Sequence, residues 1–341
     1  MNKNELRSTA HTIVMPGKGI LAADESSGTI KKRLQSVGVE STEQNRRTYR
    51  EMLFTTPDIE DYISGVILFD ETIRQSADDS TPFPLLLSGR GILPGIKVDK
   101  GTVPLPFYPG EKITEGLDGL RPRLEEYREL GAKFAKWRAV INIGQDIPTQ
   151  YCLDANAHAL ARYAALCQET GLVPIVEPEV LMDGDHTIQR CQEVTEATLK
   201  SLYDALFEAR VYLEGSLLKP NMVLPGKSSQ DQASVAEIAE ATVQALRRSV
   251  PSAVPGIVFL SGGQSPEQAT ENLNAMNALG DHPWELSFSY GRALQEPTLN
   301  AWRGAPENFQ EGQRLFLHRS RMNSAARSGD YSLEMEEARA V

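Results

Sequence analysis

The sequence is poor in the residues that disulfide and metal sites need. It has three cysteines, Cys152, Cys167 and Cys191, and five histidines among 341 residues. The cysteine spacing matches neither a disulfide framework nor a zinc ribbon, and it suits a reducing compartment. No two histidines stand four residues apart and no HExxH motif occurs, so metal-dependent chemistry is disfavoured. The segment DGDH, which ends at His186, is the one weak candidate for a metal site.

Long apolar runs and an excess of basic residues are also missing. No stretch approaches 18 apolar residues and the N-terminal segment lacks the apolar core of a secretion signal, so we expect a cytoplasmic protein that does not enter a membrane. The formal charge is −11, whereas binding nucleic acid over a broad surface needs a basic face. Nucleic acid is therefore disfavoured as a partner, and any phosphate group should be small and held locally.

Eight short apolar runs alternate with helix-patterned segments, which is typical of βα units around a parallel sheet. The segments 153–167 and 235–248 each place apolar residues on one helical stripe. No GxGxxG motif follows any run, so eight units favour a closed (β/α)8 TIM barrel, an α/β fold, over an open dinucleotide-binding sheet. We expect one barrel domain over 1–325 and a polar, mobile tail over 326–341. The predicted strands are 18–25, 64–71, 93–100, 134–140, 172–179, 214–221, 255–263 and 285–292.

Ionisable residues end or interrupt nearly every run, which is where a barrel gathers its catalytic groups. A single lysine at a strand end usually extends to solvent, but strands buried on both faces normally read as continuous Val, Ile and Leu. The charges together therefore indicate a polar mouth. They are Asp24, Glu25, Lys97, Asp99, Lys136, Arg138, Glu177, Glu179, Lys219 and Arg292.

Glu177 and Glu179 lie two residues apart on one run, so they share a face of the sheet. Two carboxylates held close together raise the pKa of one of them, as a general acid/base near neutral pH requires. The alternative is that both glutamates only form structural pairs with lysines.

Lys219 follows Leu217 and Leu218, the most apolar setting among three lysines that should converge near the barrel axis. The other two are Lys97 and Lys136. An amine attacks a carbonyl only when it is uncharged, and burial beside a second cation favours that form. We predict that Lys219 forms an imine with a carbonyl substrate and that Lys136 supplies the neighbouring charge.

Two segments on opposite sides of the mouth are predicted to bind phosphate. DESSGTIKKRL brings hydroxyls and free amides into a helix that we expect to begin near Ile30. LSGGQS offers a hydroxyl and glycine amides where barrels commonly bind phosphate, although a glycine pair alone usually marks a turn. Two anion sites indicate a substrate with phosphate at both ends. The residues concerned are Ser26, Thr29 and Arg33 in the first segment, and Ser261, Gly262 and Gly263 in the second, with Arg292 as a clamp.

The chain resembles the class I fructose-bisphosphate aldolases from about residue 5 to about residue 325. The resemblance lies in the segments GKGILAADESSGTIKKRL, PGIKVDKG, FAKWR, VPIVEPE, YLEGSLLKPNMV, FLSGGQS and FSYGRALQ. It implies a (β/α)8 barrel, usually a homotetramer, that acts in glycolysis and gluconeogenesis without a metal or other cofactor. The implied reaction is reversible cleavage of fructose 1,6-bisphosphate into dihydroxyacetone phosphate and glyceraldehyde 3-phosphate.

The resemblance also implies roles for single residues. Lys219 would form the Schiff base, with Glu177 as acid and base and Glu179 in support. Asp24 would take the proton of the C4 hydroxyl, and Lys136 would orient the substrate hydroxyls. Ser26, Thr29, Arg33 and Lys97 would lie near the C6 phosphate, and Ser261, Gly262, Gly263, Ser289 and Arg292 near the C1 phosphate.

The C-terminus departs from the family pattern. Animal and plant members end in a tyrosine that assists proton exchange on the enamine, whereas the last tyrosine here is Tyr331. The resemblance therefore implies slower enamine protonation, or a route through solvent. Thr29 stands where the family usually has serine, and since it keeps the hydroxyl we expect little effect.

Three alternatives stay open. The protein could be another Schiff-base barrel aldolase, such as a deoxyribose-phosphate aldolase or a transaldolase, although two anion sites would then be unexplained. It could be a non-catalytic binding scaffold with an aldolase-like barrel, although the intact set of catalytic residue types argues against this. It could be a zinc-dependent aldolase, which would lose its activity in EDTA.

Overall fold

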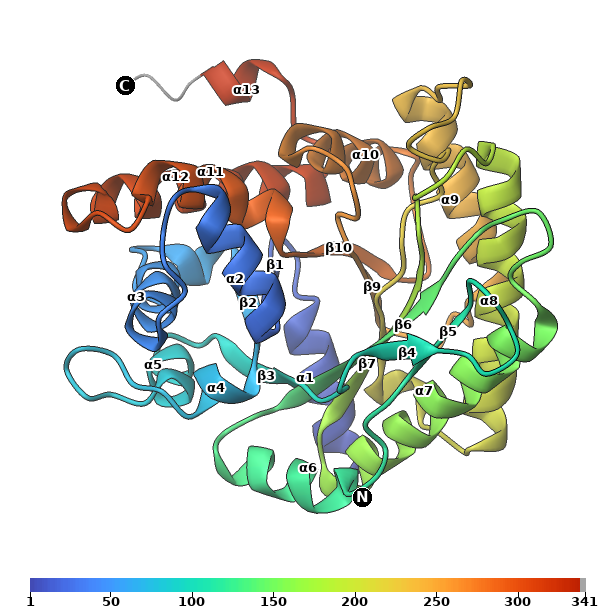
Figure 1. The fold of residues 1–341 in the computed structure, drawn as a ribbon, viewed down its shortest axis with the longest axis horizontal. Coiled ribbons are helices and arrows are strands. Elements are labelled where there is room, and N and C mark those ends of the chain that lie inside the picture. Colours follow the sequence, from blue (N-terminus) through green and yellow to red (C-terminus); the bar gives the residue numbers. More distant parts are fainter. Residues whose placement is uncertain (338–341) are drawn as a thin grey trace.

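The computed structural model describes residues 1–337, and their centre is a closed barrel of eight parallel strands (Figure 1). Its strand order is β1-β10-β9-β8-β7-β6-β3-β2. Each predicted apolar run overlaps one barrel strand, so the predicted (β/α)8 fold is confirmed. The barrel strands are β1 Gly19–Ala23, β2 Ile63–Leu68, β3 Leu93–Lys97, β6 Phe134–Ile141, β7 Val173–Val180, β8 Leu217–Leu218, β9 Gly256–Phe259 and β10 Glu285–Tyr290.

Helices surround the barrel on its outer side (Figure 1). The two predicted helical stripes belong to α7 (Gln150–Thr170) and α9 (Val235–Ser249), and α7 ends at Gly171, which has a φ of 83°. Among residues 1–337, no helix combines the length and the apolar character that crossing a membrane would need. The other helices are α1 Lys3–Ile13, α2 Ser27–Ser36, α3 Glu43–Phe54, α4 Asp70–Ile73, α5 Phe83–Gly89, α6 Leu120–Glu129, α8 Ile188–Glu208, α10 Pro266–Ala278, α11 Arg292–Trp302, α12 Phe309–Arg327 and α13 Glu334–Glu337.

Two local features differ from the sequence prediction. A hairpin of β4 (Thr102–Pro104) and β5 (Lys112–Thr114) lies between β3 and β6, and its three-residue strands are too short for an alternating pattern to reveal them. In addition, α2 begins at Ser27 rather than near Ile30. Thr29 therefore lies in the first turn of the helix, and its hydroxyl oxygen is 3.2 Å from that of Ser26.

An apolar layer fills the part of the barrel interior that lies behind the C-terminal strand ends. It explains why the charged inward-facing residues are found only at those ends, in the mouth of the barrel. Apolar residues of α1 and inward-facing residues of the strands form this layer, which includes Ala22, Phe134, Ile175 and Leu217. Their neighbours along each strand face the surrounding helices, as Leu218 does. Because residues i and i+2 share a face, the next inward positions towards the C-terminal strand ends are two residues further on. Those positions are Asp24, Lys136, Glu177 and Lys219.

The segment after α12 is packed against the rest of the protein. The predicted domain boundary at residue 326 falls inside α12, which continues to Arg327. Beyond it, the backbone amide of Tyr331 donates to Oδ1 of Asn274 at 2.9 Å, and the Tyr331 hydroxyl donates to Glu336 at 3.0 Å. Residues 338–341 of the predicted tail lie outside the described residues. The division into a barrel and a mobile tail stays a prediction.

We expect Glu336 to hold this segment in a pH-dependent way. Burial alone would raise the pKa of Glu336, but hydrogen bonding from His318 and the charge of the buried Arg319 lower it to about 2 from the usual 4.5. A folded-state pKa below that of the unfolded chain means that the contact stabilises docking above about pH 4.5 and is lost as the pH falls towards 2.

The measurement is hydrogen exchange of residues 328–337 at neutral pH in a Glu336→Gln variant. We expect faster exchange than in the wild type, because Arg319 loses its carboxylate partner. Glu334→Gln, which neutralises an exposed glutamate of the same short helix, is the matched control. Equal protection in both variants would show that Glu336 does not hold the segment.

Candidate active site

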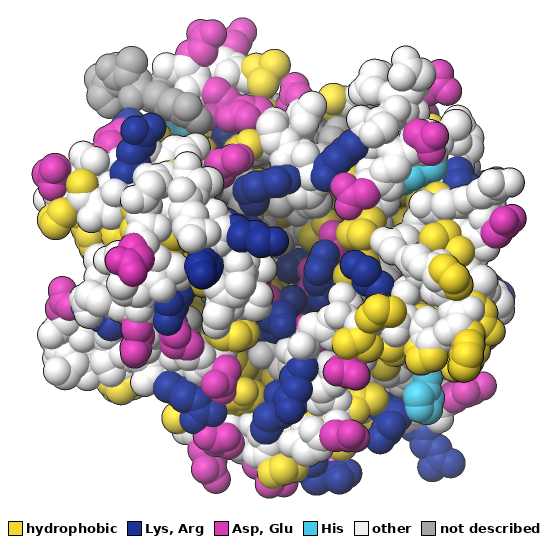
Figure 2. Space-filling view, viewed as in Figure 1, with side chains coloured by type: hydrophobic (Ala, Val, Ile, Leu, Met, Phe, Trp, Pro, Cys, Tyr) yellow, Lys and Arg dark blue, Asp and Glu magenta, His cyan; other side chains and the backbone are white. Residues whose placement is uncertain are grey.

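The C-terminal ends of the strands surround a cavity of about 990 Å³, the mouth of the barrel. Figure 2 shows Lys and Arg side chains gathered around the hollow in this face. Gly263 is the only predicted site residue that does not line the mouth; it lines an adjoining cavity of about 180 Å³. The predicted site residues that do line the mouth are Asp24, Ser26, Thr29, Arg33, Lys97, Lys136, Glu177, Glu179, Lys219, Ser261, Gly262, Ser289 and Arg292.

The charge of the mouth differs in sign from that of the whole chain. Nine basic and seven acidic side chains line it, whereas the chain carries a formal charge of −11. A concave site with an excess of positive charge attracts anions of small size while the rest of the surface repels larger polyanions. The mouth is therefore suited to a small phosphorylated molecule.

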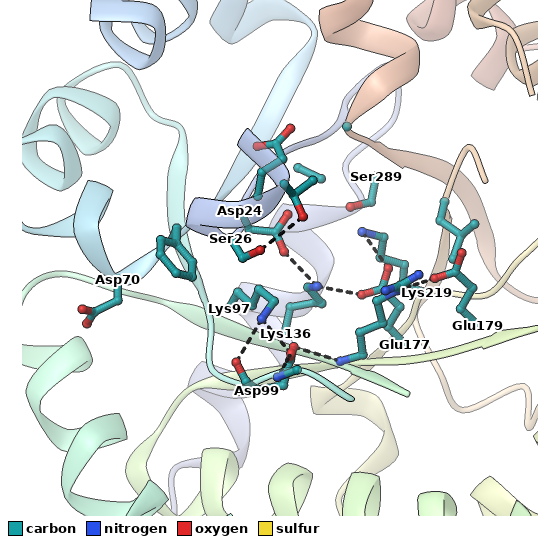
Figure 3. A pocket seen from close by; sticks show the side chains of 18 of the residues that line it. Asp24, Ser26, Asp70, Lys97, Asp99, Lys136, Glu177, Glu179, Lys219 and Ser289 are labelled. Atoms are coloured by element: carbon teal, nitrogen blue, oxygen red, sulfur yellow. Dashed lines mark hydrogen bonds and ion pairs between the residues drawn. The ribbon is translucent and has the colours of Figure 1, made fainter. Parts of the chain in front are cut away.

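Four buried side chains form a continuous chain of ion pairs at the base of the mouth (Figure 3). Nζ of Lys219 is 3.1 Å from Oε1 of Glu177, and Nζ of Lys136 is 2.8 Å from Oε2 of the same glutamate. The Lys136 ammonium is also 2.8 Å from Oδ2 of Asp24. Lys136 and Glu177 lie within β6 and β7, and Asp24 and Lys219 directly follow β1 and β8, so closure of the barrel brings the four together.

The backbone around Lys219 fixes the direction of its side chain. The Lys219 amide donates to the Val176 carbonyl at 2.8 Å, which continues the pairing of β8 with β7 by one residue. Leu217 faces the apolar layer below and Leu218 faces the helices, so position 219 must face the mouth. This arrangement explains why a lysine can follow two leucines and still be buried.

The ammonium groups keep both carboxyl groups of the chain ionised. Burial alone would raise the pKa of Asp24 and of Glu177, but the charges of Lys136 and Lys219 more than offset it and hold both pKa values below their usual range. Burial would lower the pKa of Lys136, yet Asp24 and Glu177 raise it above the usual range. The sequence predicted that a close carboxylate pair would raise one pKa. The pKa of Glu177 is lowered instead, because the ammonium groups of Lys136 and Lys219 contact its carboxylate.

Two further ion pairs flank this chain. Glu179 contacts Arg138, and Nζ of Lys97 is 2.7 Å from Oδ1 of Asp99. Asp99 and Arg138 were noted in the sequence but given no role. Strand alternation supplies the missing signal for Arg138, since it lies two residues beyond Lys136 and so faces the same cavity.

The predicted phosphate-binding residues of β9 and β10 lie together on one side of the mouth. The Ser289 hydroxyl is buried and has no hydrogen-bond partner within residues 1–337. The Arg292 guanidinium donates to the Gly262 carbonyl at 2.8 Å. Gly262 has a φ of 57°, a left-handed conformation that glycine adopts readily in turns. The Gly263 amide instead donates to the sulfur of Met182 at 3.0 Å. A free hydroxyl and a cation beside a glycine turn are groups that can bind an anion.

Next to them, Ser26 and Thr29 present their hydroxyl groups at the start of α2, because β1 pairs with β10 in the barrel. The two candidate sites are therefore neighbours around the mouth, and the predicted placement on opposite sides is wrong. Arg33 contacts Glu25 and also lies close to the β10–α11 turn. A Cβ atom placed on Gly291 would be 3.7 Å from the Arg33 guanidinium and 3.3 Å from the Ala22 carbonyl oxygen. The two predicted phosphate sites are therefore held by loops that touch one another.

The mouth also extends beyond the predicted residues, along the ends of β2 and β3. Asp70 receives hydrogen bonds from Arg74 and from the Tyr127 hydroxyl, at 2.9 and 2.8 Å. Sequence reasoning missed this rim, although Asp70 and Glu71 at the end of the predicted run 64–71 were a usable signal. Residues 1–337 contain no cluster of three or more His, Cys, Asp or Glu side chains arranged to hold a metal ion.

A buried lysine amine beside a carboxylate, with two groups of candidate phosphate-binding residues at the mouth of a (β/α)8 barrel, is what an aldolase that works through a lysine imine needs. Residues 5–341 match the family model described as fructose-bisphosphate aldolase class-I. The chain belongs to the class I fructose-bisphosphate aldolase family.

Individual relatives agree with the family model. The chain is 60% identical to "Probable fructose-bisphosphate aldolase class 1" of Xanthomonas campestris pv. campestris, over 97% of this chain and 99% of the relative. It is 58% identical to "Fructose-bisphosphate aldolase 6, cytosolic" of Arabidopsis thaliana, over 96% and 92%. Among solved structures, it matches the fructose-bisphosphate aldolase of Plasmodium falciparum, in complex with TRAP and a small-molecule inhibitor. That match has a TM-score of 0.96 and 50% identity, over 97% of this chain and 96% of the other.

Proposed function

We propose that the protein cleaves fructose 1,6-bisphosphate reversibly into dihydroxyacetone phosphate and glyceraldehyde 3-phosphate through a Schiff base on Lys219. The observation that carries this proposal is the buried contact of 3.1 Å between Nζ of Lys219 and Oε1 of Glu177. It places an amine beside a carboxylate that can accept its proton, in a cavity large enough for a sugar bisphosphate.

The first half of the reaction uses Lys219 and Glu177. Transfer of one proton from the Lys219 ammonium to Glu177 leaves a neutral amine, which attacks C2 of the open-chain ketose to give a carbinolamine. Glu177 then returns a proton to the C2 hydroxyl, which leaves as water while the imine forms. The protonated imine withdraws electrons from the C3–C4 bond.

The second half breaks that bond. Asp24 takes the proton of the C4 hydroxyl, and the electrons of the C3–C4 bond move into an enamine as glyceraldehyde 3-phosphate leaves. Lys136, which contacts both Asp24 and Glu177, stabilises the negative charge and orients the substrate hydroxyls. Protonation of the enamine at C3 and hydrolysis of the imine release dihydroxyacetone phosphate. Glu179 supports this network through its contact with Arg138.

The two anion sites would hold the ends of the substrate. Ser261, Gly262, Gly263, Ser289 and Arg292 are assigned to the C1 phosphate, and Ser26, Thr29, Arg33 and Lys97 to the C6 phosphate. We also assign the protein to the cytoplasm and to a homotetramer, as is usual in the family.

Borohydride trapping followed by peptide mapping tests this function. Reduction in the presence of dihydroxyacetone phosphate should leave a stable adduct on the peptide that contains Lys219. Turnover of fructose 1,6-bisphosphate should exceed that of monophosphorylated sugars and should persist in EDTA. Absence of an adduct would favour a binding scaffold, loss of activity in EDTA would favour a zinc aldolase, and preference for a monophosphate would favour another Schiff-base aldolase.

Tyr331 is expected to take no part in the proton transfers. Its hydroxyl donates to Glu336 and it does not line the mouth, so it is placed to anchor the segment after α12. A Tyr331→Phe variant should exchange the C3 proton of dihydroxyacetone phosphate with solvent at the wild-type rate, within about twofold. A sharp drop in exchange, with the fold intact by circular dichroism, would mean that Tyr331 reaches the enamine.

A further inference from the structure

A buried cluster at the edge of the mouth joins the loops that carry the two anion sites. It consists of Glu25 at the end of β1, Tyr49 and Arg50 on α3, and Gln295 on α11. Gln295 is 1% exposed, Tyr49 is 1% exposed and Arg50 is 3% exposed, and none of these three lines the mouth. The catalytic steps described above do not use them.

Gln295 uses all the hydrogen-bonding capacity of its amide within this cluster. Its Nε2 donates to the Ala22 carbonyl at 2.8 Å and to Oε1 of Glu25 at 3.1 Å. Its Oε1 accepts from the Tyr49 hydroxyl at 3.2 Å and from Nη1 of Arg50 at 3.1 Å. A buried polar network in which every group is satisfied fixes the geometry of the elements that it joins.

Arg50 on α3 connects two other members of the cluster. Its second nitrogen contacts Oε2 of Glu25, so one guanidinium bridges Glu25 and Gln295. The Tyr49 ring also stacks on Trp302 at the far end of α11, with centroids 5.4 Å apart. Helix α3 therefore contacts both Glu25, just after β1, and α11, at Gln295 and Trp302.

Two of the joined elements, the loop after β1 and helix α11, carry part of an anion site. Glu25 lies between Asp24 and Ser26 in the loop that leads to Thr29. Gln295 lies one helical turn after Arg292, and its backbone N–H donates to the Gly291 carbonyl at 3.1 Å. A displacement at Glu25 or Gln295 would thus be transmitted directly to the groups assigned to the two phosphates.

We infer that Gln295 and Arg50 are positioning residues that fix the separation between the two anion sites, and that this crosslink makes the enzyme select bisphosphates of one length. The inference rests on the proposed function, because it takes the substrate to be a sugar with phosphate at both ends. The residues touch neither phosphate and act through Glu25 and the first turn of α11.

The test compares Gln295→Met and Arg50→Lys with the wild type on two substrates. For fructose 1,6-bisphosphate we expect KM to rise and kcat/KM to fall by about 10-fold or more, since small displacements of binding groups have large kinetic effects. For fructose 1-phosphate, which occupies only one anion site, kcat/KM should change by less than about threefold. Equal losses on both substrates would show a merely structural role and would overturn the inference.

A binding measurement probes length selection without catalysis. Inhibition constants are measured for alkane-diol bisphosphates with five, six and seven carbons. The wild type should prefer one chain length, and both variants should bind all three within about threefold of each other. An unchanged length preference in the variants would contradict the crosslink.

Suitable controls keep the result interpretable. Gln313→Met removes a similar pair of hydrogen bonds, to Met52 and Thr55 at the end of α3 rather than to Glu25 or Ala22, and should leave the substrate ratio unchanged. Tyr49→Phe removes one of the bonds to Gln295 and gives a milder variant if the others fold poorly, with a shift of the ratio in the same direction. If wild-type protein gives no borohydride adduct, the proposed function fails, whereas normal trapping with unchanged length preference defeats only the inference.

Discussion

Replacing Lys219 by arginine is expected to lower kcat/KM for fructose 1,6-bisphosphate by about 10⁴-fold or more. Arginine keeps the positive charge next to Glu177, so the chain of ion pairs can persist, but a guanidinium does not form an imine. The variant should also show no adduct after borohydride reduction. Activity is measured by coupled assay and the adduct by mass spectrometry of the intact protein.

The matched control for this variant is Lys200→Arg. Lys200 lies on the exposed side of α8 and pairs with Asp204 at 2.8 Å, so its replacement should leave activity and trapping unchanged. Residual activity of Lys219→Arg above about 1% of the wild type, together with an adduct mapped to another lysine, would move the imine away from position 219.

Strand periodicity is the reason that the base of the mouth could be predicted from the sequence. Four runs place an apolar residue and then a charged residue at consecutive inward positions, as in Leu217 with Lys219 and Ile175 with Glu177. Any barrel with those registers brings such charges to one end. The grouping of Lys219, Glu177, Lys136 and Asp24 therefore follows from local pattern and the closed topology.

Features that depend on contacts between distant helices could not be predicted in this way. Arg50 and Gln295 lie 245 residues apart, and each looks like an ordinary polar residue of an amphipathic helix. The lowered pKa of Glu177 was likewise not predictable, because it depends on two lysines from other strands rather than on Glu179, which is nearby in sequence. Helix α2 begins three residues earlier than predicted, with Gly28, a residue of low helix propensity, in its first turn.

The second large effect is expected for Glu177→Gln, which should lower kcat by about 10²–10⁴-fold. A glutamine cannot accept the proton that Lys219 must lose or return one to the carbinolamine hydroxyl. Substrate should still bind, since none of the groups assigned to the phosphates contacts Glu177, so KM should change much less than kcat. The rate of adduct formation under borohydride should fall in parallel with kcat, because imine formation would then limit turnover.

A comparison with Glu179→Gln separates this chemical role from the loss of a negative charge at the mouth. Both substitutions remove one carboxylate from the same face of β7, but Glu179 contacts Arg138 rather than Lys219. Glu179→Gln should therefore have the smaller effect, about 10-fold, and mainly on KM. The two variants also differ in stability: Glu177→Gln leaves Lys219 without its carboxylate in a buried site, a loss that costs about 3–5 kcal/mol where no proton is released. Equal kcat values for the two variants would mean that Glu177 acts only through its charge, and that the proton leaves Lys219 by another route.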